Sequence, residues 1–147
     1  MRQITYLPPR VKIHDNGNVE LTYPWRVKYG WLFIIEVPKG FISDGNSVPW
    51  IFTRMVPKFG RNTLAGIIHD YLYKTGKMMI ADVDNPLFGS VSTPYATKTV
   101  TRKLADEVRL HLCIKCSVPK YQRILSYIAL RLFGWSAWRV HRKREKA

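Results

Sequence analysis

A histidine and an aspartate stand side by side in the otherwise apolar stretch Ala65–Tyr73, and these are the residues whose types and spacing could do chemistry. His69 and Asp70 are adjacent, and Tyr73 follows His69 by about one helical turn. Burying such polar side chains without partners costs roughly 2 kcal/mol or more each, so they must be hydrogen-bonded, paired or bound to something. This stretch is therefore the first candidate site.

The helix that carries this pair is predicted to begin after Asn62, as N-cap, and to end at Gly76, as the residue after the helix. Two small residues, Ala65 and Gly66, stand one turn before His69. They would let a second helix approach closely, and glycine inside a helix should have such a packing reason. The second helix could then carry the partner that His69 needs.

A second helix is predicted from Thr99 or Thr101 to about Lys115, on an apolar stripe of Leu104, Ala105, Val108 and Leu112. Asp106 lies at the edge of that stripe. Its carboxylate could accept a hydrogen bond from one ring nitrogen of His69 and leave the other nitrogen free as a general base. The alternative is a solvated acid, followed by the acidic Glu107.

The N-terminal part of the chain is predicted to be β. Alternating apolar residues on both sides of Asn16-Gly17 indicate a hairpin, and residues 25–29 and 31–37 form a second strand pair around Gly30. Strands followed by helices predict an α+β fold, with N-terminal antiparallel hairpins, two packed core helices and a basic C-terminal amphipathic helix. Residues 77–98 are predicted to be a long loop.

The length of 147 residues and the apolar content of 46% suit one folded domain, which we place at residues 1–138, with a basic tail at 139–147. The start of the sequence has no apolar leader, and no apolar run has the length of a transmembrane helix. The two cysteines, Cys113 and Cys116, would need two more ligands, such as His14 or His141, to bind zinc, and they favour reduced thiols in a cytosolic protein.

The net charge of +14 predicts an acidic partner, and residues 117–147 hold half of it. The same segment has apolar residues at helical spacing: Tyr121, Ile124, Leu125, Ile128, Leu132 and Trp135. Such a basic amphipathic helix is typical of an element in a membrane interface, with anionic phospholipid as the partner. Alternatively its front half, 121–132, packs on the core, while the tail from Arg139 is solvated or binds nucleic-acid phosphate.

Four short motifs resemble a domain family of unknown function found in small bacteriophage and prophage proteins: Ser43-Asp44-Gly45-Asn46-Ser47-Val48-Pro49, His69-Asp70-x-x-Tyr73, Lys103-Leu104-Ala105-Asp106 and Arg131-Leu132-Phe133-Gly134-Trp135-x-x-Trp138. The resemblance implies a phage origin and synthesis in the cytoplasm of a bacterial host. It also leaves open a place in the virion, in contact with other phage structural proteins.

The His-Asp-x-x-Tyr motif and the later aspartate are also similar to the catalytic pattern of calcium-dependent secretory phospholipases A2. That resemblance implies that His69 is the general base, that Asp70 binds calcium, and that Tyr73 and Asp106 support the histidine. Asp44, in the segment from Asp44 to Ser47, would add an oxygen ligand. Calcium would polarise the ester carbonyl and stabilise the oxyanion.

The chain departs from those phospholipases at their half-cystines, where it has Ala65, Gly66, Leu72 and Ala105, and it lacks their usual glycine-rich calcium loop. Three functions therefore stand as hypotheses. The first is a calcium-dependent lipid esterase. The second is a virion structural or tail-associated protein without catalysis, and the third is a basic nucleic-acid-binding accessory protein.

Overall fold

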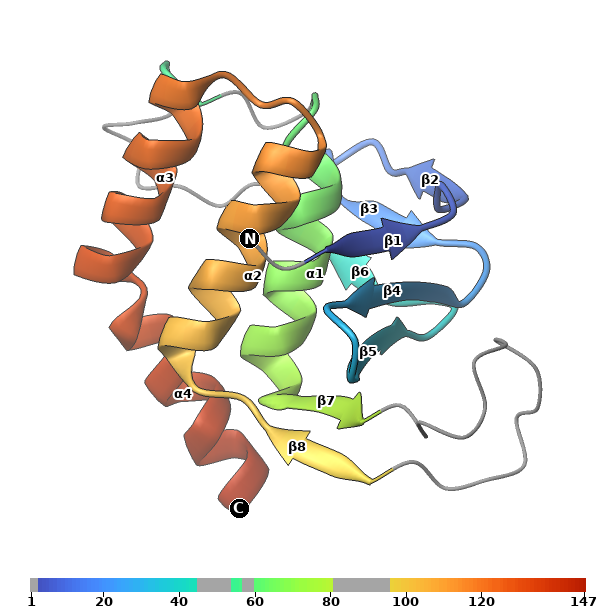
Figure 1. Cartoon of the computed structure of the whole chain (residues 1–147). Coiled ribbons are helices and arrows are strands. Elements are labelled where there is room, and N and C mark those ends of the chain that lie inside the picture. Colours follow the sequence, from blue (N-terminus) through green and yellow to red (C-terminus); the bar gives the residue numbers. More distant parts are fainter. Residues whose placement is uncertain (1–2, 45–53, 57–59, 81–95) are drawn as a thin grey trace.

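The computed structural model describes residues 3–44, 54–56, 60–80 and 96–147. In this part of the chain the strands lie on one side of the molecule and the helices on the other (Figure 1). All strand pairs are antiparallel, and the helices follow most of the strands in sequence. The predicted α+β class is thereby confirmed.

The described strands form two sheets. The larger has five strands in the order β1 (Ile4–Tyr6), β4 (Trp25–Tyr29), β5 (Phe33–Val37), β7 (Lys77–Ile80) and β8 (Thr97–Thr99). The smaller has three strands in the order β2 (Val11–Ile13), β3 (Val19–Leu21) and β6 (Ile42–Ser43).

Both predicted hairpins are present. Strands β2 and β3 pair with Val11 opposite Leu21, and the turn contains Gly17 at φ 80°. Strands β4 and β5 pair around Gly30 at φ 67°. Positive φ at these two turns favours glycine, because a Cβ atom is disfavoured there. Local turn chemistry was therefore enough to predict both strand pairs.

The predicted loop over residues 77–98 was wrong at both ends. Residues 77–80 form β7, which pairs with β5, and residues 97–99 form β8, which pairs with β7. Residues 81–95 lie outside the described part of the chain. The sequence signal was weak because β7 has only four residues and β8 is an exposed, polar strand. In addition, β7 pairs with β5, which is distant in sequence.

Two antiparallel helices, α1 (Thr63–Thr75) and α2 (Arg102–Lys115), form the centre of the molecule, with α1 between α2 and the sheets (Figure 1). Gly76 ends α1 in the left-handed conformation, as predicted, and its N–H donates to Leu72. Thr101 caps α2 through its side chain. Asn62 is the N-cap residue of α1, as predicted, and its carbonyl accepts from the N–H of Gly66, but its backbone angles are helical and its side chain makes no capping hydrogen bond.

Two further helices complete the fold: α3 (Lys120–Phe133), the outermost, and α4 (Trp135–Lys146). Buried residues of α3 are the small or aliphatic Ser126, Ala129 and Leu130. The prediction that the apolar residues of 121–132 pack on the core was wrong for four of them, which are exposed: Tyr121, Ile124, Ile128 and Leu132. Helix α3 packs against α2 through its small residues instead, so its larger apolar side chains point outward.

The residues predicted as a basic tail, 139–147, are helical as far as Lys146. Helix α4 packs on the end of α1. The ring of Trp138 meets the ring of Tyr73 edge to face, with 5.2 Å between centroids, and Arg142 donates to the carbonyls of Tyr73 and Lys74. None of the described helices combines the length and the apolar character needed to cross a membrane.

Candidate functional site

Asp106 is the centre of a buried hydrogen-bond network that joins three helices. Its Oδ1 accepts hydrogen bonds from Nε2 of His69 at 2.9 Å and from the hydroxyl of Tyr73 at 2.7 Å. Its Oδ2 accepts from Nη1 of Arg131, on α3, at 2.8 Å. Asp106 has no exposed surface, and His69 is 6% exposed. The structure thus brings together the three predicted residues, and Asp106 is not a solvated acid.

The network keeps Asp106 charged and His69 neutral. Burial alone would raise the pKa of Asp106, but the hydrogen bonds from His69, Arg131 and Tyr73 outweigh it and lower that pKa. Burial lowers the pKa of His69, against the opposing effect of its hydrogen bond to Asp106. A neutral imidazole that donates from Nε2 has its proton there, so Nδ1 presents a lone pair.

His69 also lines a pocket of about 420 Å³ between α1, β6, α3 and α4. One wall carries polar side chains that include Asp44, Asp70 and His69, and another is formed by apolar residues of α3 and α4. The lining residues are Asn18, Ile42, Asp44, Gly66, His69, Asp70, Tyr73, Lys74, Arg109, Ala129, Leu130, Phe133, Gly134, Ala137 and His141. A neutral histidine and two carboxyl groups therefore share one cavity.

Asp70 and Asp44 form a hydrogen-bonded carboxyl pair in this pocket. The hydroxyl of Ser43, at the end of β6, donates to Oδ2 of Asp70 at 2.5 Å. Burial and then the charge of Asp44 raise the pKa of Asp70 to about 8, although Ser43 and Lys74 act in the opposite direction. Two adjacent carboxyl groups cannot both ionise at low cost, so one keeps a proton unless a cation neutralises the pair.

The chemistry of these donors fits a hard cation. Asp44 and Asp70 supply carboxylate oxygens and Ser43 a hydroxyl oxygen, which are the ligand types that Ca²⁺ takes. Within the described residues no group of three or more His, Cys, Asp or Glu side chains could hold a metal, so further ligands would have to be carbonyl, amide or water oxygens. The rest of the predicted 44–47 segment, Ser47 included, lies outside the described residues.

We expect the variant Asp70→Asn to flatten the dependence of stability on pH. The usual pKa of an aspartate is about 4, and that of Asp70 in the folded chain is about 8. Between these two pH values Asp70 holds a proton in the folded chain that it releases in the unfolded chain. The free energy of unfolding of the parent therefore falls as pH rises, by up to about 1.4 kcal/mol per pH unit from this group. Urea unfolding in chelator across this range measures the difference between parent and variant, and parallel curves would contradict the prediction.

Sequence reasoning missed three residues of the site: Ser43, Arg131 and Gly134. Each stands in one of the family motifs, which was the available signal. Ser43 and Arg131 were named only within those motifs and were given no role at the site. Their partners, Asp70 and Asp106, are 27 and 25 residues away in sequence, so no local pattern indicates these contacts.

Gly134, between α3 and α4, is required by the close approach of Tyr73. A Cβ at this position would lie 2.6 Å from the carbonyl oxygen of Leu130 and 2.7 Å from the hydroxyl of Tyr73. Both distances are far below van der Waals contact. Glycine is thus the residue that lets the hydroxyl of Tyr73 reach Asp106 beside the α3–α4 junction.

We expect Gly134→Ala to destabilise the chain by about 1–3 kcal/mol, the usual cost of forcing extra atoms into a packed site. Urea unfolding measures it. A double-mutant cycle with Tyr73→Phe separates the causes, because removing the hydroxyl relieves one of the two clashes. If Gly134→Ala lowered the free energy of unfolding equally in the parent and in Tyr73→Phe, the close contact between Gly134 and the hydroxyl of Tyr73 would be contradicted.

The fold and the pocket define an α+β protein with a buried His-Asp pair. Residues 19–130 match the family described as protein of unknown function (DUF1353), and the chain belongs to this family. The matched range contains His69, Asp70, Tyr73 and Asp106. No curated protein and no solved structure matches the chain.

Proposed function

We propose that this protein is a calcium-dependent lipid esterase whose reaction takes place in the 420 Å³ pocket. One observation carries the proposal: a neutral histidine, oriented by a buried carboxylate, lines the same cavity as a carboxyl pair that a cation would neutralise. Strongly perturbed titratable groups that converge in a cavity are typical of catalytic sites.

His69 would act as general base through Nδ1. It takes a proton from water while the water oxygen bonds to the carbonyl carbon of the ester, which gives a tetrahedral intermediate. When the intermediate collapses, the carbon–oxygen bond to the alcohol breaks and His69 returns the proton to the alcohol oxygen. The products are a carboxylic acid and an alcohol, so atoms and protons balance.

Asp106 supports this cycle without contacting the ester. Its carboxylate fixes the tautomer of His69 and stabilises the imidazolium that forms during the reaction. Tyr73 and Arg131 hold the carboxylate in place through one hydrogen bond each. These are positioning residues, because they act through His69.

Asp44 and Asp70 would hold the calcium, which when bound supplies Lewis-acid polarisation of the ester carbonyl. The carboxyl pair thus has a role that explains its place in the pocket that His69 lines. Leu130, Phe133 and Ala137 form an apolar wall of the pocket, suited to an acyl chain. Together these features favour an ester of a fatty acid over a small polar substrate.

The test is release of fatty acid from vesicles that contain anionic phospholipid, with calcium and with chelator. The proposal expects release with calcium and none with chelator. Binding of calcium is followed separately, as a rise in melting temperature of the parent that Asp70→Asn lacks. Absence of release by folded, calcium-binding protein over several lipid compositions would overturn the proposal and leave the network as a brace between helices.

A further inference from the structure

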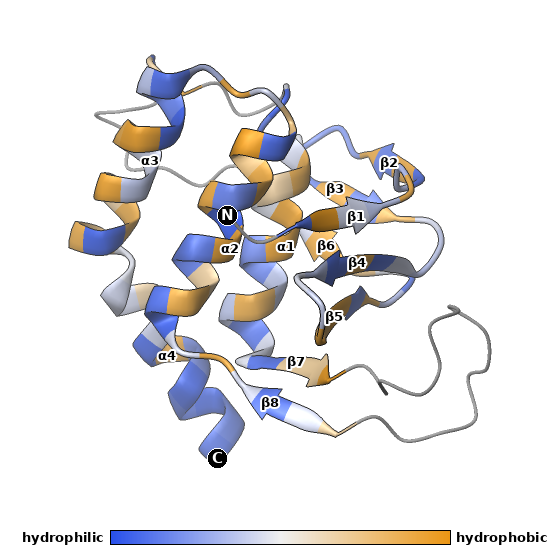
Figure 2. Ribbon diagram, in the orientation of Figure 1, coloured by the Kyte–Doolittle hydropathy of each residue, from blue (hydrophilic) through white to orange (hydrophobic). Residues whose placement is uncertain are grey.

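Helix α3 presents an apolar face to the outside of the molecule. Its members recur every three or four residues and are between 43% and 59% exposed: Tyr121, Ile124, Ile128, Leu132 and, at the start of α4, Trp135. We call this set the outer face. Figure 2 shows the apolar residues recurring along α3, whereas the last turns of α4 are hydrophilic.

The packing of α3 does not account for the outer face. The helix is attached to α2 by small and polar contacts: Arg109 donates to the hydroxyl of Ser126 at 2.8 Å, and Arg102 donates to the carbonyl of Leu130 at 3.0 Å. The large apolar residues lie on the opposite side from these contacts. A contiguous apolar surface of this kind marks an interaction site in a folded protein.

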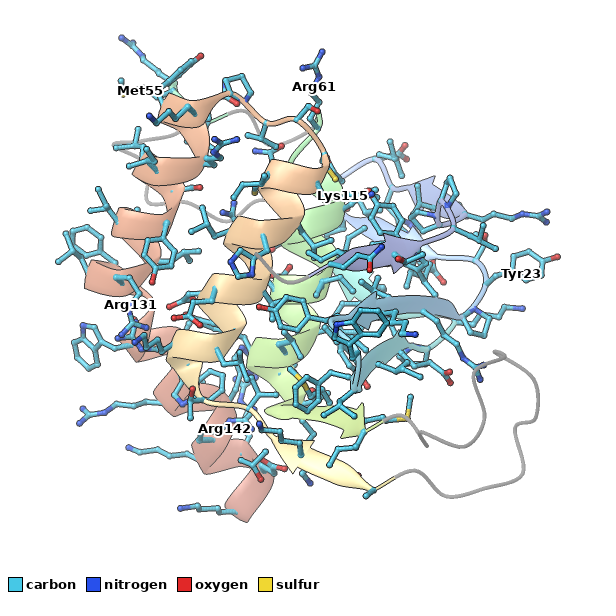
Figure 3. All side chains as sticks on the ribbon, viewed as in Figure 1. Tyr23, Met55, Arg61, Lys115, Arg131 and Arg142 are labelled. Carbon is cyan, nitrogen blue, oxygen red and sulfur yellow. The ribbon has the colours of Figure 1, made fainter. Side chains whose placement is uncertain are left out.

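At the first turn of α3 the outer face borders an apolar groove of about 630 Å³. Met55, which is 52% exposed, contributes to the groove together with Tyr121, Ile124 and Ile128. Figure 3 shows Met55 beside the first turn of α3. The groove therefore extends the exposed apolar surface beyond the helix itself.

Positive charge lies at both ends of the outer face. Lys120 lines the groove at its start, and Arg139 lies over the ring of Trp135 at 5.1 Å at its end. No acidic residue occurs between Glu107 and Glu145, a range that includes all of α3 and almost all of α4. An occupant of this face must therefore be apolar in its middle and anionic at its border.

We propose that the outer face docks on the surface of an anionic phospholipid bilayer. Aliphatic side chains and Trp135 would enter the acyl boundary while the surrounding lysines and arginines meet the headgroup phosphates. Two copies of the chain, each with a charge of +14, would repel one another across this face. The phosphates of a nucleic acid would neutralise the lysines and arginines but would leave Ile124, Ile128 and Leu132 without apolar contacts.

The outer face and the pocket share helices α3 and α4. Phe133 lines the pocket, is 51% exposed and directly follows Leu132 of the outer face. Ala137, on α4, lines the same pocket two residues after Trp135. The pocket wall that we propose for the acyl chain includes Leu130 and thus lies on the inner side of α3, opposite the outer face. Docking itself does not depend on the proposed hydrolysis.

The test is co-sedimentation with phosphatidylcholine vesicles with and without phosphatidylglycerol, in chelator so that no calcium-dependent reaction proceeds. The full chain is expected to bind only the anionic vesicles. The double variant Ile128→Ser with Leu132→Ser should bind roughly tenfold more weakly, because apolar area that enters the interface is lost. Both residues are exposed, so the variant should fold like the parent.

The matched control replaces two equally exposed residues on another face, Val11→Ser with Ile13→Ser on β2, and should bind like the parent. Equal binding by the Ile128 and Leu132 variant, or no binding of the parent to any anionic vesicle, would overturn the proposal. So would a stable dimer of the parent that the same substitutions dissociate, or duplex DNA binding that they abolish in the absence of vesicle binding. Vesicle binding without fatty acid release would contradict the proposed esterase alone.

Discussion

Replacing His69 by glutamine is expected to reduce fatty acid release by roughly a hundredfold to ten-thousandfold, the usual contribution of a general base. The amide nitrogen of glutamine can still donate to Asp106, as Nε2 of His69 does now. The substitution therefore removes the proton acceptor and leaves the buried acceptor of the network satisfied. Initial rates with calcium on anionic vesicles measure the loss, and circular dichroism confirms that the variant is folded.

The matched control is His111→Gln, on the same helix as Asp106. His111 is hydrogen-bonded to Tyr29 at 2.7 Å and does not line the pocket. Its variant should release fatty acid at close to the parental rate. A His69→Gln variant that is folded and as active as His111→Gln would eliminate His69 as the base, even if calcium-dependent release is observed.

Replacing Asp106 by alanine is expected to lower the free energy of unfolding by roughly 3–5 kcal/mol, the usual cost of breaking a buried ion pair from one side. The variant leaves Arg131, His69 and Tyr73 without their common acceptor. Urea unfolding at pH 7 measures the loss. Glu107→Ala is the matched control: its partner Lys103 lies 3.8 Å away on the exposed side of α2, so the change should stay within about 0.5 kcal/mol.

The stabilisation by Asp106 should also depend on pH. Because its pKa in the folded chain is lowered, its contribution is fully present above about pH 4, the usual pKa of an aspartate, and is lost as pH falls further. The difference between parent and Asp106→Ala should therefore shrink on acidification. A difference that is constant from pH 7 to pH 3 would show that the carboxylate does not stabilise the fold as an anion.

These two variants separate the roles that the network combines. His69→Gln removes the base and keeps the acceptor satisfied, whereas Asp106→Ala removes the acceptor and leaves donors buried. If the network were only a brace, Asp106→Ala would lower the stability strongly. His69→Gln would lower it little, because glutamine keeps the hydrogen bond to Asp106. The ratio of activity loss to stability loss in His69→Gln thus distinguishes a catalytic role of His69 from a purely structural one.

The sequence alone was sufficient for the local features of this protein. Glycine at positive φ predicted the turns at Gly17 and Gly30 and the end of α1 at Gly76, because its lack of a Cβ permits those backbone angles. Helical periodicity placed His69 and Tyr73 on one face of α1 and Asp106 beside the apolar stripe of α2. Polar residues in an apolar pattern have to find a partner, which is why this contact could be predicted.

Only the tertiary structure decided the contacts between segments that are far apart along the chain. The pairing of β1 with β4 and of β5 with β7, the hydroxyl of Ser43 on Asp70, and Arg131 on Asp106 all depend on how α1, α2 and the sheets pack. The same holds for the outer face of α3. Its periodicity shows an apolar stripe, but the stripe points outward because the small residues Ser126 and Ala129 fit against α2 instead.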